Sequence, residues 1–481
     1  MNYGRVKIYT DTKEITAENV RAEVDKAFGI HVRNRNAIDT LWDYYRGKTA
    51  ILKKEKEIRP EINHRTNENR AYEAVKFHKG YVFGEPIQYV RRENTKANDA
   101  DDDIAADINS LNGYMSDADK TECDNSLSEW MYVAGTAYRL TLPNARWTAD
   151  GDEPPFMMYA LDPRKTFVVY SSDIYERPVM AVCYVERENK DLEFSIYTEK
   201  AYFEYKQFDT ITVKPNPLGM IPIIEYPAEN ARLGVFEPVI PLLDALDELQ
   251  SNRLDDIVQF VNSFLAILGA ELDAETYEKL QELKTLCLPL GSDAKYLSAT
   301  LSQSDVQTLK NDLCQSIWTI CGVPNRNGGT STSDTGSAVI LRDGWEAAEA
   351  RAKATEAIFK SSEKETLKIV LRILRDKGGT KLRLADIVPH FTRRNYDNIA
   401  SKSQVLIAML NSPWIHPEVA YASCGMFPDP ESAYLQGKEW HEEQERKNEE
   451  KMKNANIGTD PMSAVQQKAD GLEGTGSDKV S

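Results

Sequence analysis

The stretch GVPNRNGGTSTSDTGSAVILRDGW, residues 322–345, joins two unlike patterns and organises the rest of the chain around it. On its N-terminal side, Gly322 followed by Pro324 is a signal that commonly ends a helix. On its C-terminal side a helical pattern begins that meets no proline until Pro389. Between them, residues 325–337 contain no apolar side chain. The sequence therefore predicts a polar loop at the foot of a long helix.

The helix after the loop is expected over residues 338–376, which is about 60 Å at 1.5 Å per residue. Six alanines fall between residues 347 and 357, and such small side chains allow another backbone to approach closely. Gly344 and the pair Ser361-Ser362 are expected bends in this helix. Its alanine face packs either against the chain's own core or against a neighbouring subunit.

Two amphipathic helices are expected before the loop, with a small insert between them. The first follows Glu237-Pro238 and carries Leu, Ile and Val on one face and carboxylates on the other. The acidic residues of that helix are Asp244, Asp247, Glu248, Asp255 and Asp256. The second helix is expected to start at Ser304, which forms a capping box with Gln307. The insert, residues 264–300, is predicted to contain strands and one helix.

The first half of the chain changes character at about residue 134. Residues 17–58 and 68–82 have helical spacing, and residues 97–133 become helical after a polar start. Residues 134–236 hold short segments rich in Val, Tyr, Phe and Thr, separated by Asn, Asp, Gly and Pro. This pattern predicts an antiparallel sheet, so the fold class is α+β.

After the long helix, residues 382–394 predict a strand and residues 398–411 predict a helix. Residues 412–453 are also expected to be helical. The composition from residue 454 onward is typical of disorder.

The totals suit a folded protein without a membrane span. The chain has 481 residues, 41% of them hydrophobic and 28% charged. No apolar run reaches the roughly 18 residues that a membrane span needs, and the N-terminus lacks the apolar core of a signal peptide. We therefore expect the protein to be made and kept in a cytoplasm. The net charge of −17 argues against tight binding to nucleic acid, because neutralising phosphates requires clustered Lys and Arg.

Motifs for catalysis are absent from the sequence. The loop has no lysine with which to form a P-loop, and the six histidines show no close ligand spacing. Residues 98–107 lack the glycine and glutamate of a calcium loop. The six cysteines form no C-x-x-C pair and predict free thiols. We therefore expect no catalytic residue, no cofactor and no metal, and a protein that is not an enzyme.

The order of several segments resembles the portal proteins of tailed bacteriophages, and is most similar to the branch from long-tailed phages with Gram-positive hosts. The resemblance covers residues 35–410. The segments are YYRGKTAILKK, GYVFGEPIQYV, AGTAYRL, LDPRKTFVVYSSD, NPLGMIPIIEY and LGVFEPVIPLLDALDELQS, followed by the loop and the long helix.

This resemblance implies a homo-oligomeric ring, usually a dodecamer, at one capsid vertex of the virion, assembled in the host cytoplasm. Double-stranded DNA enters through the ring during packaging, driven by a separate terminase, and leaves through it during ejection. The implied partners are terminase, head-completion adaptors that form the head-tail connector, the major capsid and scaffold proteins, and DNA passing without sequence specificity. No catalytic site is implied.

The resemblance also divides the chain into parts. In chain order these are the wing at 1–236, a stem helix at 237–263, the clip at 264–300, a second stem helix at 301–323, the tunnel loop at 324–337, the long buttress helix at 338–376, a return to the wing at 377–411, the crown at 412–453 and a disordered tail at 454–481. The clip is the part expected to contact terminase and adaptors.

The tunnel loop is the part expected to face DNA. Its residues are Asn325, Arg326, Asn327, Gly328, Gly329, Thr330, Ser331, Thr332, Ser333, Asp334, Thr335 and Gly336. The glycines supply backbone freedom, and the amides and hydroxyls can exchange hydrogen bonds with phosphates. Arg326 is the one base, and Asp334 cancels its charge. If the acidic stem helix faces the lumen, its carboxylates would repel the duplex and keep it centred.

Two alternative functions remain open at this point. One is another phage head structural protein, such as a scaffold or minor capsid component, which would lack the order of stem, insert, stem, loop and long helix. The other is an enzyme acting on DNA, which would need a nucleotide-binding motif or a convergent carboxylate cluster. The sequence has that order of segments and neither of these enzyme signatures, which favours the portal.

Overall fold

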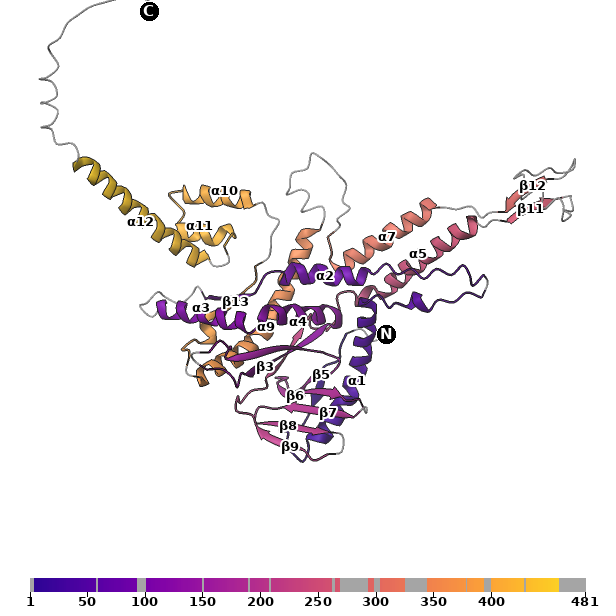
Figure 1. Ribbon diagram of the computed structural model, residues 1–481, viewed down its shortest axis with the longest axis horizontal. Coiled ribbons are helices and arrows are strands. Elements are labelled where there is room, and N and C mark those ends of the chain that lie inside the picture. The colour runs from indigo at the N-terminus through magenta and orange to yellow at the C-terminus, as the bar shows by residue number, and fades with distance from the viewer. Residues whose placement is uncertain are drawn as a thin grey trace, which may run out of the picture. The chain divides into compact units, whose positions relative to one another are not determined.

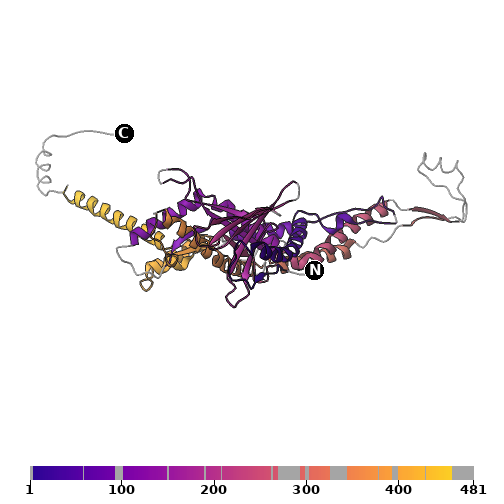
Figure 2. The ribbon, with the colours of Figure 1, turned by 90° about the horizontal axis from the view of Figure 1, so that it is seen from below.

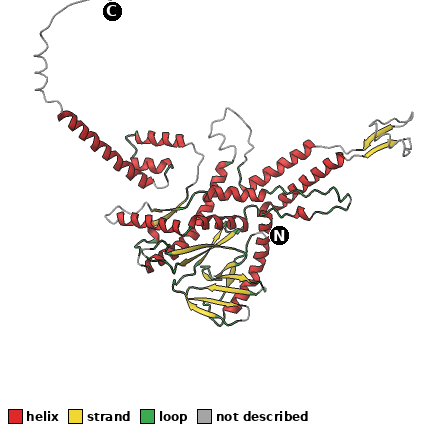
Figure 3. Ribbon diagram, in the orientation of Figure 1, coloured by secondary structure: helices red, strands yellow, loops and turns green. Residues whose placement is uncertain are grey.

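The computed structural model describes residues 4–57, 59–92, 101–148, 151–188, 191–206, 209–261, 264–268, 293–297, 303–324, 344–377, 379–392, 399–427 and 430–457. The chain divides into two compact units, Met1–Arg394 and Asn395–Ser481, which we call the N-terminal unit and the C-terminal unit. Figure 1 labels their helices and strands, and Figure 3 distinguishes the two kinds of element.

The larger sheet of the N-terminal unit has six strands in the order β1-β5-β6-β7-β8-β9. Their bounds are Ile8–Thr10 for β1, Thr166–Ser171 for β5, Pro178–Glu186 for β6, Leu192–Tyr197 for β7, Ala201–Lys206 for β8 and Thr212–Pro215 for β9. Neighbours along β5 to β9 are antiparallel, whereas β1 joins β5 in parallel. Helix α1, Val20–Tyr45, buries Val20 and Val24 in the same cluster as the side chains of this sheet.

Two smaller sheets complete the strand-rich region. The three-stranded sheet has the order β10-β3-β4, with bounds Ile223–Pro227, Thr136–Pro143 and Phe156–Leu161. The two-stranded sheet pairs β2, Gln88–Arg91, with β13, Ile387–His390. The sequence prediction of antiparallel strands within residues 134–236 is confirmed, but it missed β1, and the strands form separate sheets.

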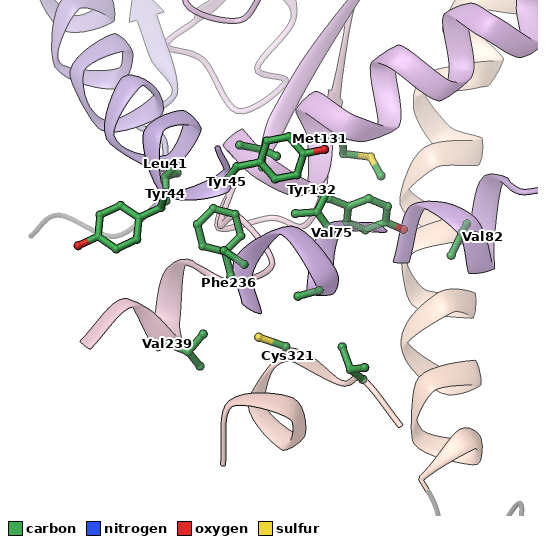
Figure 4. Packing of buried hydrophobic residues seen from close by; sticks show 14 of the residues in the cluster. Leu41, Tyr44, Tyr45, Val75, Val82, Met131, Tyr132, Phe236, Val239 and Cys321 are labelled. Carbon is green, nitrogen blue, oxygen red and sulfur yellow. The ribbon is translucent and has the colours of Figure 1, made fainter. Parts of the chain in front are cut away.

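Several helices of this unit pack around one apolar cluster, part of which is shown in Figure 4. Helix α2 covers Arg70–Phe83, and the side chain of Asn69 accepts a hydrogen bond from the backbone of Tyr72 to cap its start. Helices α3 and α4 cover Asp101–Asp117 and Lys120–Ala134. The residues buried there include Val75 from α2, Met131 from α4, Phe236 just before the 3-10 turn Glu237–Val239, and Cys321 at the end of α7, Gln303–Cys321.

Gly135 makes the sharp turn from α4 into β3 possible. It has a φ of +76°, and a Cβ added to it would lie 2.1 Å from the backbone oxygen of Arg232. Only glycine accommodates both conditions.

Helices α5, Ile240–Val261, and α7, Gln303–Cys321, lie side by side. Figures 1 and 2 show a small pair of strands beyond their ends. These strands are β11, Phe264–Leu268, and β12, Asp293–Leu297, which pair antiparallel. The two helices and the strands between them agree with the prediction, whereas the helix expected in the insert falls within residues 269–292, which lie outside the described residues. Helix α7 begins at Gln303, so Ser304 lies inside the helix and the expected cap at Ser304 is wrong.

Helix α9 covers Trp345–Asp376, with 32 residues, so it spans about 48 Å. The expectation of one continuous helix from residue 338 is wrong. Gly344 has a φ of +83°, a left-handed conformation that a right-handed helix cannot contain, so α9 starts after it. Ala348 and Ala352 pack within the same chain, each only 2% exposed, whereas Ala347, Ala350, Ala354 and Ala357 are exposed. A turn at Leu384–Asp386 then leads to β13, in agreement with the predicted strand.

The C-terminal unit contains α10, Ile399–Leu410, α11, Pro417–Cys424, and α12, Pro430–Ile457. Its core is small, with Leu406, Ala420 and Cys424 buried. Helix α10, which the sequence grouped with a return to the wing, packs against α11. The predicted tail begins at residue 454, but α12 continues to Ile457, and residues 458–481 lie outside the described residues.

Candidate functional site: the base of the polar loop and the stem helices

The predicted tunnel loop, residues 325–336, lies outside the described residues. Both ends of the loop segment are described, because the chain is followed to Pro324 after α7 and again from Gly344 before α9. The candidate site can therefore be built from its two anchors.

The first anchor holds the C-terminal end of α7. The guanidinium of Arg351, on α9, donates to the backbone oxygen of Ile320 at 2.8 Å and to that of Thr319 at 3.4 Å. The carbonyl of Ile320 lies in the last turn of the helix, and that of Thr319 also accepts from the Gly322 backbone at 3.3 Å. A cation at this end complements the helix dipole. Gly322 has a φ of +74°, and a Cβ added to it would lie 2.5 Å from Nη1 of Arg351. The glycine therefore lets the arginine reach the helix end.

A histidine from α2 completes the first anchor. His78 Nε2 lies 2.8 Å from the backbone oxygen of Cys321. Because a carbonyl oxygen can only accept, Nε2 carries the proton and donates. Burial lowers the pKa of His78 to about 4, the hydrogen bond to Cys321 opposes this, and Arg351 adds to it. His78 is therefore neutral at pH 7 and binds as a dipole.

The second anchor holds the start of α9. The ring centroid of Trp345 lies 6.0 Å from that of Phe77 and 6.0 Å from that of Tyr81, both on α2. The hydroxyl of Tyr81 donates to Glu349 Oε2 at 2.8 Å. One turn of α2 thus contacts both ends of the loop segment, through His78 at the entry and through the aromatic pair at the exit. The loop is attached to a packed base on each side.

The acidic residues of α5 do not share one environment. Asp247 is 2% exposed and accepts from the Thr49 hydroxyl at 2.8 Å, from the Asn67 amide at 2.9 Å and from the Glu68 backbone at 2.9 Å. Burial raises the pKa of this carboxyl, and the three hydrogen bonds oppose the rise. Its partners lie in residues 46–68, a segment along α5 that we call the strap.

Asp255 also binds the strap. It is 1% exposed and forms ion pairs with Lys54 at 3.5 Å and with Lys56, and it accepts from His64 Nδ1 at 2.7 Å and from the His64 backbone at 2.8 Å. Burial opposes ionisation, yet the hydrogen bonds from His64 and Lys56 lower the pKa of Asp255 to about 2. The carboxylate therefore fixes the strap to the helix.

The remaining acidic residues are closer to water. Asp244 is half-buried and accepts from the Tyr44 hydroxyl at 2.8 Å, whereas Glu248 and Asp256 are exposed. The expectation that all five carboxylates line an open face of α5 is therefore wrong for Asp247 and Asp255, which the chain's own strap covers. A repulsive role towards DNA stays a prediction for Glu248 and Asp256 alone.

A buried network of charges, which the sequence analysis missed, attaches α9 to the sheets. Arg139 on β3 donates to Glu363 on α9 at 2.7 Å and to the Tyr226 hydroxyl at 3.0 Å, and it also pairs with Asp124. Lys120 pairs with Asp124 at 2.5 Å and with Glu363 at 3.4 Å. The side chains of Arg139 and Glu363 are both 0% exposed.

The charges in this network balance, with two bases against two carboxylates. Burial works against ionisation of Glu363, but Arg139 and Lys120 hold its pKa below the usual value. A fully enclosed set of matched charges indicates a structural role in fixing α9. Arg139 within the apolar strand segment AGTAYRL was the one signal in the sequence, because a buried arginine needs an acidic partner.

Metal and membrane sites were sought in the described residues. Among them, no three of His, Cys, Asp and Glu come together closely enough to hold a metal ion. The helices that the structure describes include none of sufficient length and apolarity to cross a bilayer. Five of the six cysteines are described and are free thiols, as the sequence predicted.

Comparison with known proteins bears on the same architecture. The family described as phage portal protein, SPP1 Gp6-like, matches residues 25–454. No curated protein sequence matches the chain. Among solved structures, a chain of "Virion of native gene transfer agent (GTA) particle" is similar with 13% identity and a TM-score of 0.42, covering 75% of this chain and 90% of that chain. That likeness is too distant to carry an argument. Because the family match spans most of the sequence, the chain belongs to the SPP1 Gp6-like family of phage portal proteins.

Proposed function

We propose that this portal protein assembles with copies of itself into a ring, a dodecamer by the family resemblance, at one vertex of the phage head. The ring conducts double-stranded DNA during packaging and ejection. The observation that carries the proposal is the family match over residues 25–454. The α5–α7 pair, the polar loop attached at both ends and the long helix α9 support it, because they follow the order that the resemblance implies.

The loop anchors suggest how the conduit works. Arg351, His78 and the aromatic pair on α2 hold the loop ends, while residues 325–337 supply hydroxyls, amides and glycines. Such a loop can exchange hydrogen bonds with passing phosphates without net charge, so it contacts DNA without retaining it. The proposed function needs no catalytic group and no cofactor.

The proposed partners follow the family resemblance. Terminase and then the head-completion adaptors dock at the insert that contains β11 and β12, and the wing contacts the major capsid and scaffold proteins. The phage from which the protein comes is proposed to be a long-tailed phage with a Gram-positive host. The protein is made in the host cytoplasm and becomes part of the capsid vertex.

Electron microscopy of the purified protein, together with native mass spectrometry, tests the ring. We expect rings with a central hole wide enough for duplex DNA and a mass that is an integral multiple of the chain. A compact monomer or dimer that persists at high concentration and with scaffold protein present would contradict the proposal. It would favour a scaffold or minor capsid component instead.

The role of the loop is tested by Arg326→Ala in assembled heads. If Arg326 makes brief phosphate contacts, packaging rate or DNA retention should change while rings still form. A matched control is Arg187→Ala, which removes an exposed arginine from the β6–β7 end of the large sheet. Equal behaviour of both variants and the parent protein would exclude a role for Arg326.

A further inference from the structure

The second half of α9 carries a row of bases on the face that is turned away from the core. Lys364, Lys368, Arg372 and Arg375 are all exposed. They recur every three or four residues, so they lie along one side of the helix. At 1.5 Å per residue the row extends over about 16 Å. The opposite face of this half of α9 is buried in the core.

Three of these bases border a cavity of about 420 Å³. The other residues that line it are Leu218, Gly219, Met220, Leu371 and Leu384. No carboxylate lines this cavity among the described residues. Arg375 is held at its edge, because its Nη2 donates to the backbone oxygen of Leu382 at 2.6 Å. The result is a recess with an apolar floor and cationic walls.

The charge of this segment is opposite in sign to that of the chain as a whole. Residues 360–383 contain eight Lys and Arg against three Asp and Glu, in a protein with a net charge of −17. One of the three acids, Glu363, points into the buried network. The other two lie at the surface, where Glu365 pairs with Lys368 at 2.6 Å and Asp376 pairs with Arg372 at 3.1 Å. Surface pairs of this kind are weak, so a polyanion can compete with them.

The chemistry of the surface favours nucleic acid over protein as the anion. Among the described residues, no large hydrophobic side chain is strongly exposed between residues 360 and 392. Protein–protein interfaces are rich in aromatic residues and Met and poor in Lys, whereas protein–DNA interfaces are polar and positively charged. Double-stranded DNA carries one negative charge about every 1.7 Å along its axis, so a cationic row meets phosphates on any sequence.

We propose that the row Lys364, Lys368, Arg372 and Arg375 binds the phosphate backbone of double-stranded DNA without reading its sequence. The proposal rests on the proposed function only in that a DNA conduit brings duplex DNA to the protein. It adds a contact that is separate from the tunnel loop. The contact is weak and sensitive to salt, because it consists of exposed charges with acidic neighbours.

The test measures binding of a short fluorescent duplex to the full-length protein by anisotropy over a salt series. The variant Lys364→Gln/Lys368→Gln/Arg372→Gln removes three exposed charges and leaves Arg375 bound to Leu382. Its matched control is Lys26→Gln/Lys200→Gln/Lys214→Gln, which also removes three exposed lysines, each from an ion pair elsewhere on the surface.

We expect the row variant to bind the duplex about tenfold more weakly than the parent, with the slope of log affinity against log salt smaller by about 2.7. The control should stay within about twofold of the parent. The variant Glu365→Gln/Asp376→Asn should bind more tightly than the parent, because it removes the two competing carboxylates.

Three outcomes would overturn the proposal. They are an absence of duplex binding by the parent at low salt, equal weakening of the row variant and its control, and row-dependent binding of polyglutamate in place of DNA. The last result would assign the row to an acidic protein partner. Microscopy of the same samples separates this proposal from the previous one. If rings form but the row variant binds DNA as the parent does, only the proposal for the basic row is rejected. If the row variant binds DNA more weakly but no rings form, only the proposal of a ring is rejected.

Discussion

Two of the buried carboxylates in the N-terminal unit, Glu363 and Asp255, differ in how far their partners are from water. In the network under α9, the partners of Glu363 are Arg139 and Lys120, which are 0% and 4% exposed. On α5, the partners of Asp255 are Lys54, Lys56 and His64, which are 16%, 23% and 41% exposed. Both carboxylates have a lowered pKa, but only the first is enclosed together with its bases.

The difference indicates how costly the loss of one charged partner is in each set. A charge left without a partner inside the network has no access to water, so removing one member should be costly. The lysines of the strap can turn towards solvent when their carboxylate is lost, because their side chains are long and partly exposed. The network therefore fixes α9 to the sheets, whereas the strap is held to α5 more loosely.

The substitution Arg139→Met should produce the largest effect. It leaves Glu363 and Asp124 buried with one base between them, and we expect a loss of about 3–5 kcal/mol in the free energy of unfolding. Denaturant unfolding followed by circular dichroism measures it. The matched control is Arg187→Met, which breaks an exposed pair with Glu193 and should cost less than about 1 kcal/mol. Equal losses of unfolding free energy in the two variants would show that burial of the ion pair makes no difference to its removal.

Stability should fall as the pH is lowered from about 6.5 towards 4. Burial holds the pKa of His31 and of His78 at about 4, below the usual 6.5, so between these values the unfolded chain binds protons that the folded chain does not. Protonation then favours unfolding, by about 2.5 kcal/mol for each histidine and about 5 kcal/mol in total. The variant His78→Asn should lose about half of this pH dependence, while His441→Asn, at an exposed position, should keep all of it. Identical pH profiles for the two variants would contradict this account.

Two neighbouring aspartates on α5 allow a buried carboxylate to be compared directly with an exposed one. Asp255→Asn removes the ion pairs to the strap and should cost about 2 kcal/mol. Asp256→Asn changes an exposed carboxylate and should stay within about 0.5 kcal/mol of the parent. Proteolysis of the strap, followed by mass spectrometry, should show faster cleavage in the first variant alone. If both variants behave alike, Asp255 does not hold the strap.

Gly322→Ala tests the anchor at the loop entry. The left-handed backbone and the closeness of Arg351 should together cost about 1–2 kcal/mol. Gly80→Ala on α2 is the matched control, because a Cβ there has no heavy atom within 4 Å. In a helix interior this change should stabilise the protein by about 0.5–1 kcal/mol. If both variants change the free energy of unfolding in the same direction, Gly322 is not required for the close contact with Arg351.

The smallest effect on stability is expected for Glu248→Lys with Asp256→Lys. Both side chains are exposed, so unfolding should change by less than about 0.5 kcal/mol. If these carboxylates keep DNA centred, packaging into heads should nevertheless slow while rings form normally. An unchanged packaging rate would leave them as ordinary solvated charges.

Much of the secondary structure followed from local patterns. The amphipathic spacing of α5 and α7, the β-branched and aromatic strands between residues 134 and 236, and the stop at Gly322 all agree with the structure. These features depend on periodicity and turn chemistry, which neighbouring residues carry. The missed features were β1, which pairs with a strand more than 150 residues later in the chain, and the left-handed Gly344.

The candidate site was predictable only in part. The position of the loop segment between two helices could be recognised from composition. Its anchors could not, because they include α2, whose His78 donates to the carbonyl of Cys321. The strap could not be foreseen either, since Asp247 and Asp255 have the same local pattern as the exposed Glu248 and Asp256. Nothing in the helix periodicity states which of them a distant segment covers.

The sequence alone determined the order of the elements, the polar character of the loop and the absence of motifs for catalysis, because each of these is written in neighbouring residues. The tertiary structure decided which charges are buried. Arg139 and Glu363 are 224 positions apart, and only folding brings them to 2.7 Å from each other. The free energy of a charge depends on its distance from water and from its counter-charge, and both are properties of the folded chain.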